Sequence, residues 1–86
     1  MANSNSAKKR IRQNITARAR NRWRMRKMRD AMKKFDDAIT TGSNEDATAA
    51  YRTVSSIIDR TAQTGVIHRN QASRRKSRLN TRLKAK

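Results

Sequence analysis

The stretch MRKMRDAMKKFDDAITTG, residues 25–42, predicts the fold of this chain. Its apolar side chains recur at alternating intervals of three and four residues, at Met25, Met28, Met32, Phe35 and Ile39. That spacing forms a seam along one side of an α-helix and excludes a β-strand face. Gly42 follows directly and is typical of a helix C-terminus. We therefore expect a helix that ends near residue 41.

Upstream of the seam, in ARARNRWRMRKMR (residues 17–29), arginine occupies every second position from Arg18 to Arg26. A period of two is typical of a strand, but no Gly or Pro precedes Gly42 and helix formers dominate the segment. We therefore extend the helix back to about residue 6. At about 100° per residue the cations then form two nearly opposite ridges. One ridge contains Arg18, Arg22, Arg26 and Arg29, and the other contains Arg20, Arg24 and Lys27.

Two shorter helices are predicted after the first, over about 44–64 and 68–84. Ser43 and Asp46 form a capping-box pattern, and Gly65 ends the second helix. The apolar face of the second helix includes Ala47, Ala50, Tyr51, Val54, Ile57, Ile58 and Ala62, and that of the third includes Ala72, Leu79 and Leu83. The fold class expected is all-α: a three-helix antiparallel bundle in one domain, residues 1–86. Because the seam turns polar before Met25, the N-terminal half of the first helix should project.

The charge of the chain indicates a polyanionic partner. Lys and Arg number 23 against six acidic residues, a net charge of +17, and no acidic residue precedes Asp30. Leu, Ile, Val and Phe together are only 11 residues, so the core is thin and opposed by self-repulsion. We expect folding to be completed by binding. A rod that is basic on two sides suits insertion between two phosphate backbones, whereas a flat anionic surface needs only one basic face.

Catalytic and metal sites are not predicted. The chain has no cysteine, and His68, the only histidine, has no cluster of ligands around it in the sequence. His68 is better explained by a helix-start or phosphate-contact role. Asp36 and Asp37 are adjacent and do not converge as an acid–base pair on a helix. We therefore expect no enzyme, cofactor, metal or small-molecule substrate.

The N-terminal region permits two interpretations of location. It lacks the apolar region of a secretory signal, and no run of residues is long and apolar enough for a membrane span. Its 11 basic residues before Asp30 are similar to an organelle transit peptide, but residues 16–24 have no amphipathic face. An intracellular, soluble protein is the favoured interpretation.

Trp23 lies on the far side of the first helix from the seam, so it should not be a core residue. Two roles stay open: stacking on a nucleobase or sugar, or packing beneath a neighbouring arginine or on the third helix. Tyr51, on the apolar face of the second helix, is expected in the core.

Two stretches, MANSNSAKKRIRQN (1–14) and GVIHRNQASRRKSRL (65–79), resemble the terminal signatures of the bacterial small ribosomal subunit protein S-twenty family. The second is the more specific of the two. The resemblance implies a three-helix bundle that binds small-subunit ribosomal RNA directly and early in assembly, in the cytoplasmic ribosome. It implies RNA contacts at Ser6, Lys8, Lys9, Arg10, Arg12, His68, Arg69, Asn70, Arg74, Lys76, Ser77 and Arg78.

The helix argument adds further candidates for RNA contact. These are Arg18, Arg20, Arg22, Trp23, Arg24 and Arg26 on the first helix, and Arg75 and Arg82 on the basic face of the third. Other ribosomal components are further candidate partners, and an obligate homo-oligomer is not expected. A DNA-compacting protein is the main alternative, although no recognition helix or dimer seam is evident. A membrane-active cationic helix is a third, but it needs one continuous apolar face, and Trp23 points away from Phe35.

Overall fold

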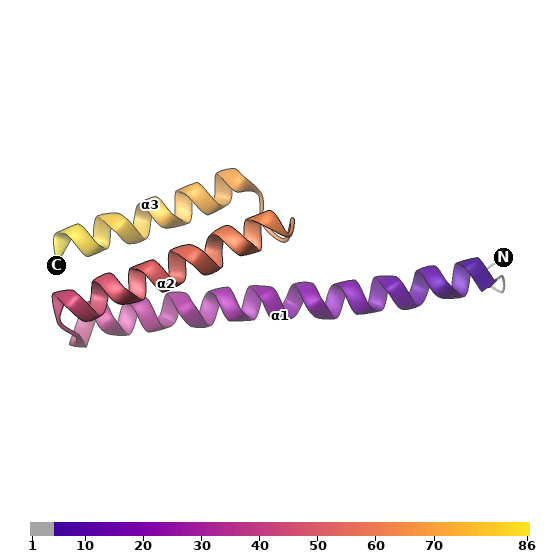
Figure 1. The fold of residues 1–86 in the computed structure, drawn as a ribbon, viewed down its shortest axis with the longest axis horizontal. Helices are drawn as coiled ribbons and strands as arrows, with labels where there is room; N and C mark the ends of the chain where they lie inside the picture. Colours follow the sequence, from indigo (N-terminus) through magenta and orange to yellow (C-terminus); the bar gives the residue numbers. More distant parts are fainter. Residues whose placement is uncertain (1–4) are drawn as a thin grey trace.

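Three helices joined by short turns make up the part of the chain that the structure describes, residues 5–86 of a computed structural model (Figure 1). They are α1 (Asn5–Thr41), α2 (Asn44–Gln63) and α3 (Arg69–Ala85). No strand occurs within residues 5–86, so the all-α prediction is confirmed. Each helix begins and ends within one residue of the range expected from the sequence.

Consecutive helices run in opposite directions. Figure 1 shows α2 returning along the C-terminal half of α1, and α3 returning along α2. Phe35 and Tyr51 illustrate the first pairing, with ring centroids 6.1 Å apart. Contacts between α3 and α1 keep a nearly constant offset of 43 to 47 residues, which is the pattern of parallel helices. They join Arg75 to Met32, Arg82 to Asp36, and Lys86 to Ile39.

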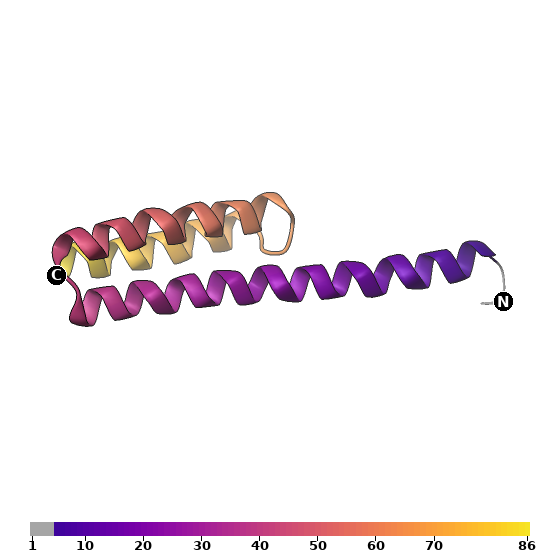
Figure 2. The same ribbon diagram turned by 60° about the horizontal axis from the view of Figure 1, so that its bottom comes forward.

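The N-terminal half of α1 extends beyond the other two helices (Figures 1 and 2). At about 1.5 Å per residue, the 37 residues of α1 span about 55 Å, against about 30 Å for the 20 residues of α2. The molecule measures 58 × 23 × 13 Å along its principal axes. We call residues 5–22 the projecting segment. Within it every side chain is exposed except those of Ala7 and Ala17, which are half-buried.

The core lies where the three helices overlap. Its largest fully buried side chains are Phe35 and Met28 from α1 and Val54 and Ile58 from α2. The smaller or nearly buried members are Ala31, Ile67, Ala72 and Leu79. Tyr51, expected in the core, is half-buried and packs against Phe35.

The buried face of α1 differs from the predicted seam. Met28 and Phe35 are fully buried as expected, but the third buried residue is Ala31, which the seam did not include. Met25, Met32 and Ile39 pack against the core and stay partly exposed. The reason is that α2 lies over the side of α1 that carries Ala31, while α3 contacts the side that carries Met32 and Ile39. The buried face is therefore rotated toward the ridge of Arg20 and Arg24.

The two turns end their helices by different means. Ser43 Oγ accepts from Asp46 N at 3.1 Å, and Asp46 Oδ2 accepts from Ser43 N at 3.3 Å, which is the predicted capping box. Gly65 has φ +81°, and its N–H and that of Val66 donate to the carbonyls of Ala62 and Thr61. That pattern is a Schellman motif. Gly42 is not left-handed; a Cβ there would lie 2.8 Å from the Ala38 carbonyl oxygen, so close approach explains this glycine.

Candidate nucleic-acid interface

The basic side chains of the projecting segment all point into solvent. Ser6 is exposed in the first turn of α1, and the exposed cations that follow it are Lys8, Lys9, Arg10, Arg12, Arg18, Arg20 and Arg22. No acidic residue precedes Asp30 in the sequence, so no carboxylate of α1 lies within a turn of these cations. Like charges four residues apart, such as Arg18 and Arg22, destabilise a helix, and a bound polyanion removes that repulsion.

Residues of α3 form a second exposed polar face. Asn70, Arg74, Ser77 and Arg78 are all exposed, and their spacing of four, three and one residues keeps them on one side of the helix. Arg69 is exposed at the first position of α3. On the opposite side Ala72 and Leu79 are buried against the bundle. The face is therefore directed away from the core, and its cationic side chains are exposed to solvent.

His68 is the N-cap of α3, as one of its two predicted roles required. Its Nδ1 accepts a hydrogen bond of 3.0 Å from the backbone N–H of Asn70. In the neutral imidazole the proton then lies on Nε2, which can donate to a phosphate oxygen. One side chain can thus cap the helix and still offer an N–H donor to an anion.

Replacing His68 by alanine removes this cap, and we expect a loss of about 1 kcal/mol of folding stability. Asparagine is a strong N-cap residue and should retain most of that stability. Urea unfolding followed by circular dichroism measures the difference. If His68→Asn and His68→Ala are equally destabilised, the cap is not what His68 contributes.

Three of the predicted RNA-binding residues of α3 have partners inside the bundle. Lys76 Nζ lies 2.8 Å from Asp59 Oδ1 of α2, and Arg82 pairs with Asp36 of α1. Arg75 directs a guanidinium nitrogen at the Met32 sulfur, 3.8 Å away. These side chains lie beside the buried face of α3 and join α3 to α1 and α2. Arg74 and Arg78, by contrast, are on the exposed face.

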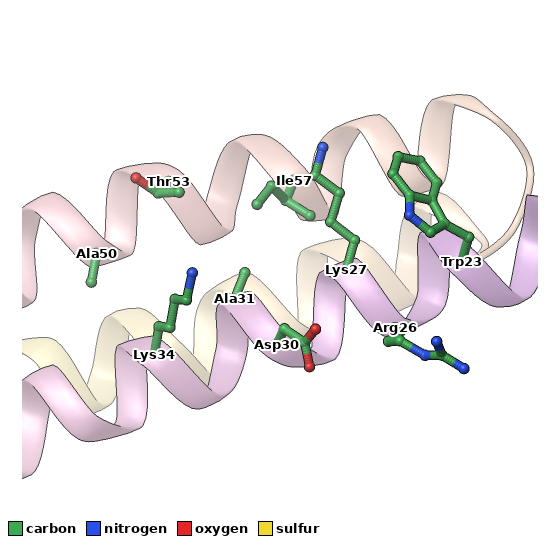
Figure 3. Close-up of a pocket in the computed structure, with 9 residues that line it drawn as sticks. All are labelled: Trp23, Arg26, Lys27, Asp30, Ala31, Lys34, Ala50, Thr53 and Ile57. Carbon is green, nitrogen blue, oxygen red and sulfur yellow. The ribbon is translucent and has the colours of Figure 1, made fainter.

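Trp23 lies where α1 leaves the bundle. Its side chain is 58% exposed, and Lys27 Nζ lies 5.2 Å from the ring centroid, within range of a cation–π contact. The neighbour above the ring is therefore a lysine rather than the arginine considered from the sequence, and the ring lies beside α2, with Ile57, rather than on α3 (Figure 3). Arg26 is exposed, and Arg24 is half-buried because the buried face of α1 is rotated toward it.

The two groups of predicted RNA-binding residues do not meet. Residues 6–12 lie at the far end of α1, whereas α3 lies entirely on the bundle (Figure 1). Between them lies a shallow groove, lined among others by Arg22, Arg26, Arg29 and Asp30 of α1 and by Gly65 and Val66 of the turn before α3. The cations thus form an extended surface rather than a closed site.

Among residues 5–86, no group of three or more His, Cys, Asp or Glu side chains is placed to hold a metal ion. None of the helices described is both long and apolar enough to cross a membrane.

Comparison with known proteins decides the family. A family model described as ribosomal protein S20 matches residues 2–84. The chain belongs to this family. Relatives named small ribosomal subunit protein bS20 include one from Cellvibrio japonicus, 52% identical over 85 residues, and one from Saccharophagus degradans, 49% identical over the same length. A third, from Shewanella piezotolerans, is also 49% identical, and each match covers 99% of this chain and 97% of the relative.

Membership of the ribosomal protein S20 family confirms the resemblance found in the terminal stretches. It also confirms that the chain is not an enzyme, because the family consists of ribosomal structural proteins.

Arg60 and Gln63 of α2 line a groove together with Trp23, and the sequence analysis did not predict this position for them. For Arg60 the signal was available, because it lies one turn after Ile57, beside the apolar face of α2.

Proposed function

We propose that the chain is a structural constituent of the small ribosomal subunit that binds small-subunit ribosomal RNA directly and supports its assembly in the cytoplasmic ribosome. The whole chain, residues 1–86, acts as one RNA-binding domain. The observation that carries the proposal is the acid-free projecting segment, with exposed cations on two sides, in a member of a ribosomal protein family.

The proposed mechanism is neutralisation of phosphates on RNA segments that pack against each other. Each phosphate contact releases condensed counterions, so affinity falls steeply with salt. Fifteen of the 23 basic residues are arginines, whose planar guanidinium groups make bidentate phosphate contacts. RNA helices hide their base edges in a deep major groove, so shape rather than base sequence gives selectivity at the projecting segment.

The proposed RNA-binding residues divide into two groups with different surroundings. On α1 they are Ser6, Lys8, Lys9, Arg10, Arg12, Arg18, Arg20, Arg22, Trp23, Arg24 and Arg26; on α3 and its cap they are His68, Arg69, Asn70, Arg74, Arg75, Lys76, Ser77, Arg78 and Arg82. Arg75, Lys76 and Arg82 also hold the bundle together. We propose no membrane or small-molecule partner and no obligate homo-oligomer; other ribosomal components are further partners.

Competition binding tests this function. Labelled fragments of small-subunit ribosomal RNA are titrated with the protein at several salt concentrations, with a DNA duplex of matched length as competitor and circular dichroism recorded in parallel. We expect one fragment to retain the protein against DNA, and helicity to rise on binding because ordering is coupled to association. Equal competition by DNA at every salt concentration would instead identify a general polyanion binder.

A further inference from the structure

Trp23, one of the proposed RNA-binding residues, lies between two grooves that separate α1 from α2. The first, of about 490 Å³, is lined among others by Trp23, Lys27, Lys34, Ala50 and Ile57. The second, of about 400 Å³, is lined among others by Trp23, Arg24, Lys27, Arg60, Gln63 and Thr64. Both volumes lie within the range of about 300–1,000 Å³ that is usual for small-molecule sites.

The walls of these grooves combine an apolar surface with cations. Figure 3 shows Trp23, Lys27 and Lys34 extending from α1 toward α2, while Arg26 points away. Ala31, Ala50 and Ile57 contribute apolar surface to the first groove, which also contains one carboxylate, Asp30. The second groove is lined by three cations and no acidic residue. Each groove is therefore electropositive beside an exposed aromatic ring.

The geometry points to an unpaired nucleotide of RNA as the occupant, its base stacked on the indole of Trp23 and the flanking phosphates held by the cations of the two grooves. This inference rests on the proposed function, because it assumes that the polyanion is RNA. Aromatic rings for stacking beside a basic groove for the backbone are the two components of single-strand recognition. A base within a duplex is stacked on both faces, so only a bulged, looped or terminal nucleotide can use this site.

Residues of the second groove also offer groups that can recognise a base edge. The amide of Gln63 both donates and accepts hydrogen bonds. The Thr64 hydroxyl donates to the Thr61 carbonyl at 2.9 Å, which leaves its lone pairs as acceptors. Lys27 lies over the indole and lines both grooves, so it is positioned to contact a phosphate on either side. The site therefore has different chemistry from the projecting segment, which carries cations but no aromatic ring.

The test uses the intrinsic fluorescence of the full chain, because Trp23 is its only tryptophan. Two RNA hairpins are compared that are identical except for one unpaired nucleotide bulged from the stem, and affinity is measured separately by anisotropy of end-labelled RNA. We expect the bulged hairpin to quench Trp23 emission and the fully paired one to leave it nearly unchanged. Trp23→Ala should weaken binding of the bulged hairpin about 5-fold to 150-fold, the range that the loss of one base stack gives, and leave binding of the paired hairpin unaffected.

Trp23→Phe keeps an aromatic face and should retain part of the preference for the bulged hairpin. Ile15→Ala is the matched control, because Ile15 is 62% exposed and lies on the projecting segment away from the grooves; its preference should equal that of the wild type. The inference is overturned if both hairpins bind without quenching, if both quench equally, or if Trp23→Ala weakens both alike. The grooves would then be open to another occupant, such as a neighbouring protein, and the proposed function would stand. If neither hairpin binds the wild type but a fragment of small-subunit ribosomal RNA does, the inference is overturned and the proposed function stands. If no fragment of that RNA binds either, the proposed function itself fails.

Discussion

Replacing Arg18 and Arg22 by glutamine should weaken binding to ribosomal RNA roughly 60-fold at 0.1 M salt, and replacing Lys9 and Arg20 should weaken it by a similar factor. The two pairs lie on nearly opposite sides of the projecting segment, and all four side chains are exposed. Each lost phosphate contact lowers the slope of log affinity against log salt by about 0.9. Two contacts therefore account for the 60-fold change over the tenfold interval between 1 M and 0.1 M salt.

The two double variants remove the same charge, so their comparison reports geometry rather than net charge. Lys33→Gln with Arg52→Gln is the matched control: it also removes two exposed cations, but from the bundle and outside the proposed RNA-binding residues. Salt titrations of all three, with the same RNA fragment, give the slopes. If only the Arg18 and Arg22 variant loses affinity, RNA contacts α1 on one side only. That result would contradict the proposal that α1 lies between two phosphate backbones. An equal loss in the control would show that only total charge matters.

The helices and their ends were predictable because local chemistry determines them. Gly65 ends α2 by adopting a positive φ, and Ser43 begins α2 by forming a capping box with Asp46. Both effects depend only on residues of the same turn. The length of α1 followed from the absence of Gly and Pro before Gly42, and its projection followed from the polar residues upstream of Met25.

The orientation of α1 in the bundle was less predictable, because periodicity places residues on a face without saying which helix covers it. Ala31 is buried because α2 packs over its side of α1, and the two helices can approach closely over a small side chain. Met32 and Ile39 were counted among the seam residues but stay partly exposed, on the side of α1 that α3 contacts. Both α2 and α3 therefore pack on the apolar face of α1. The sequence pattern of α1 does not show whether one helix or two cover that face.

The environment of Trp23 could have been derived from the sequence by counting across the turn. Phe35 and Tyr51 are in ring contact, and each is eight residues from Ser43. The same antiparallel register places Trp23, 20 residues before Ser43, opposite Gln63, 20 residues after it, and both line one groove. The partners of Arg75, Lys76 and Arg82 could not be derived in this way, because long cations beside an apolar face can pair inward or reach outward.

Phe35→Ala should have the largest effect on stability, with a loss of about 3–5 kcal/mol. Phe35 is fully buried, its ring contacts Tyr51 at 6.1 Å between centroids, and the Arg82 guanidinium carbon lies 5.9 Å from its centroid. Small domains are stable by about 5–15 kcal/mol, and a thin core opposed by a net charge of +17 places this one toward the lower end. We therefore expect the free variant to lose much of its helical signal at 25 °C by circular dichroism.

Ile15→Ala is the control for that experiment, because the side chain is exposed and alanine is a good helix former; its thermal transition should match that of the wild type. Ribosomal RNA should then restore helicity to Phe35→Ala, since a ligand at 100 times its dissociation constant stabilises the folded state by about 2.7 kcal/mol. A free variant that unfolds like the wild type would show that the apolar core does not hold the bundle together. A variant that unfolds when free and regains no helix with RNA would show that binding does not supply the missing stability, contrary to coupled ordering.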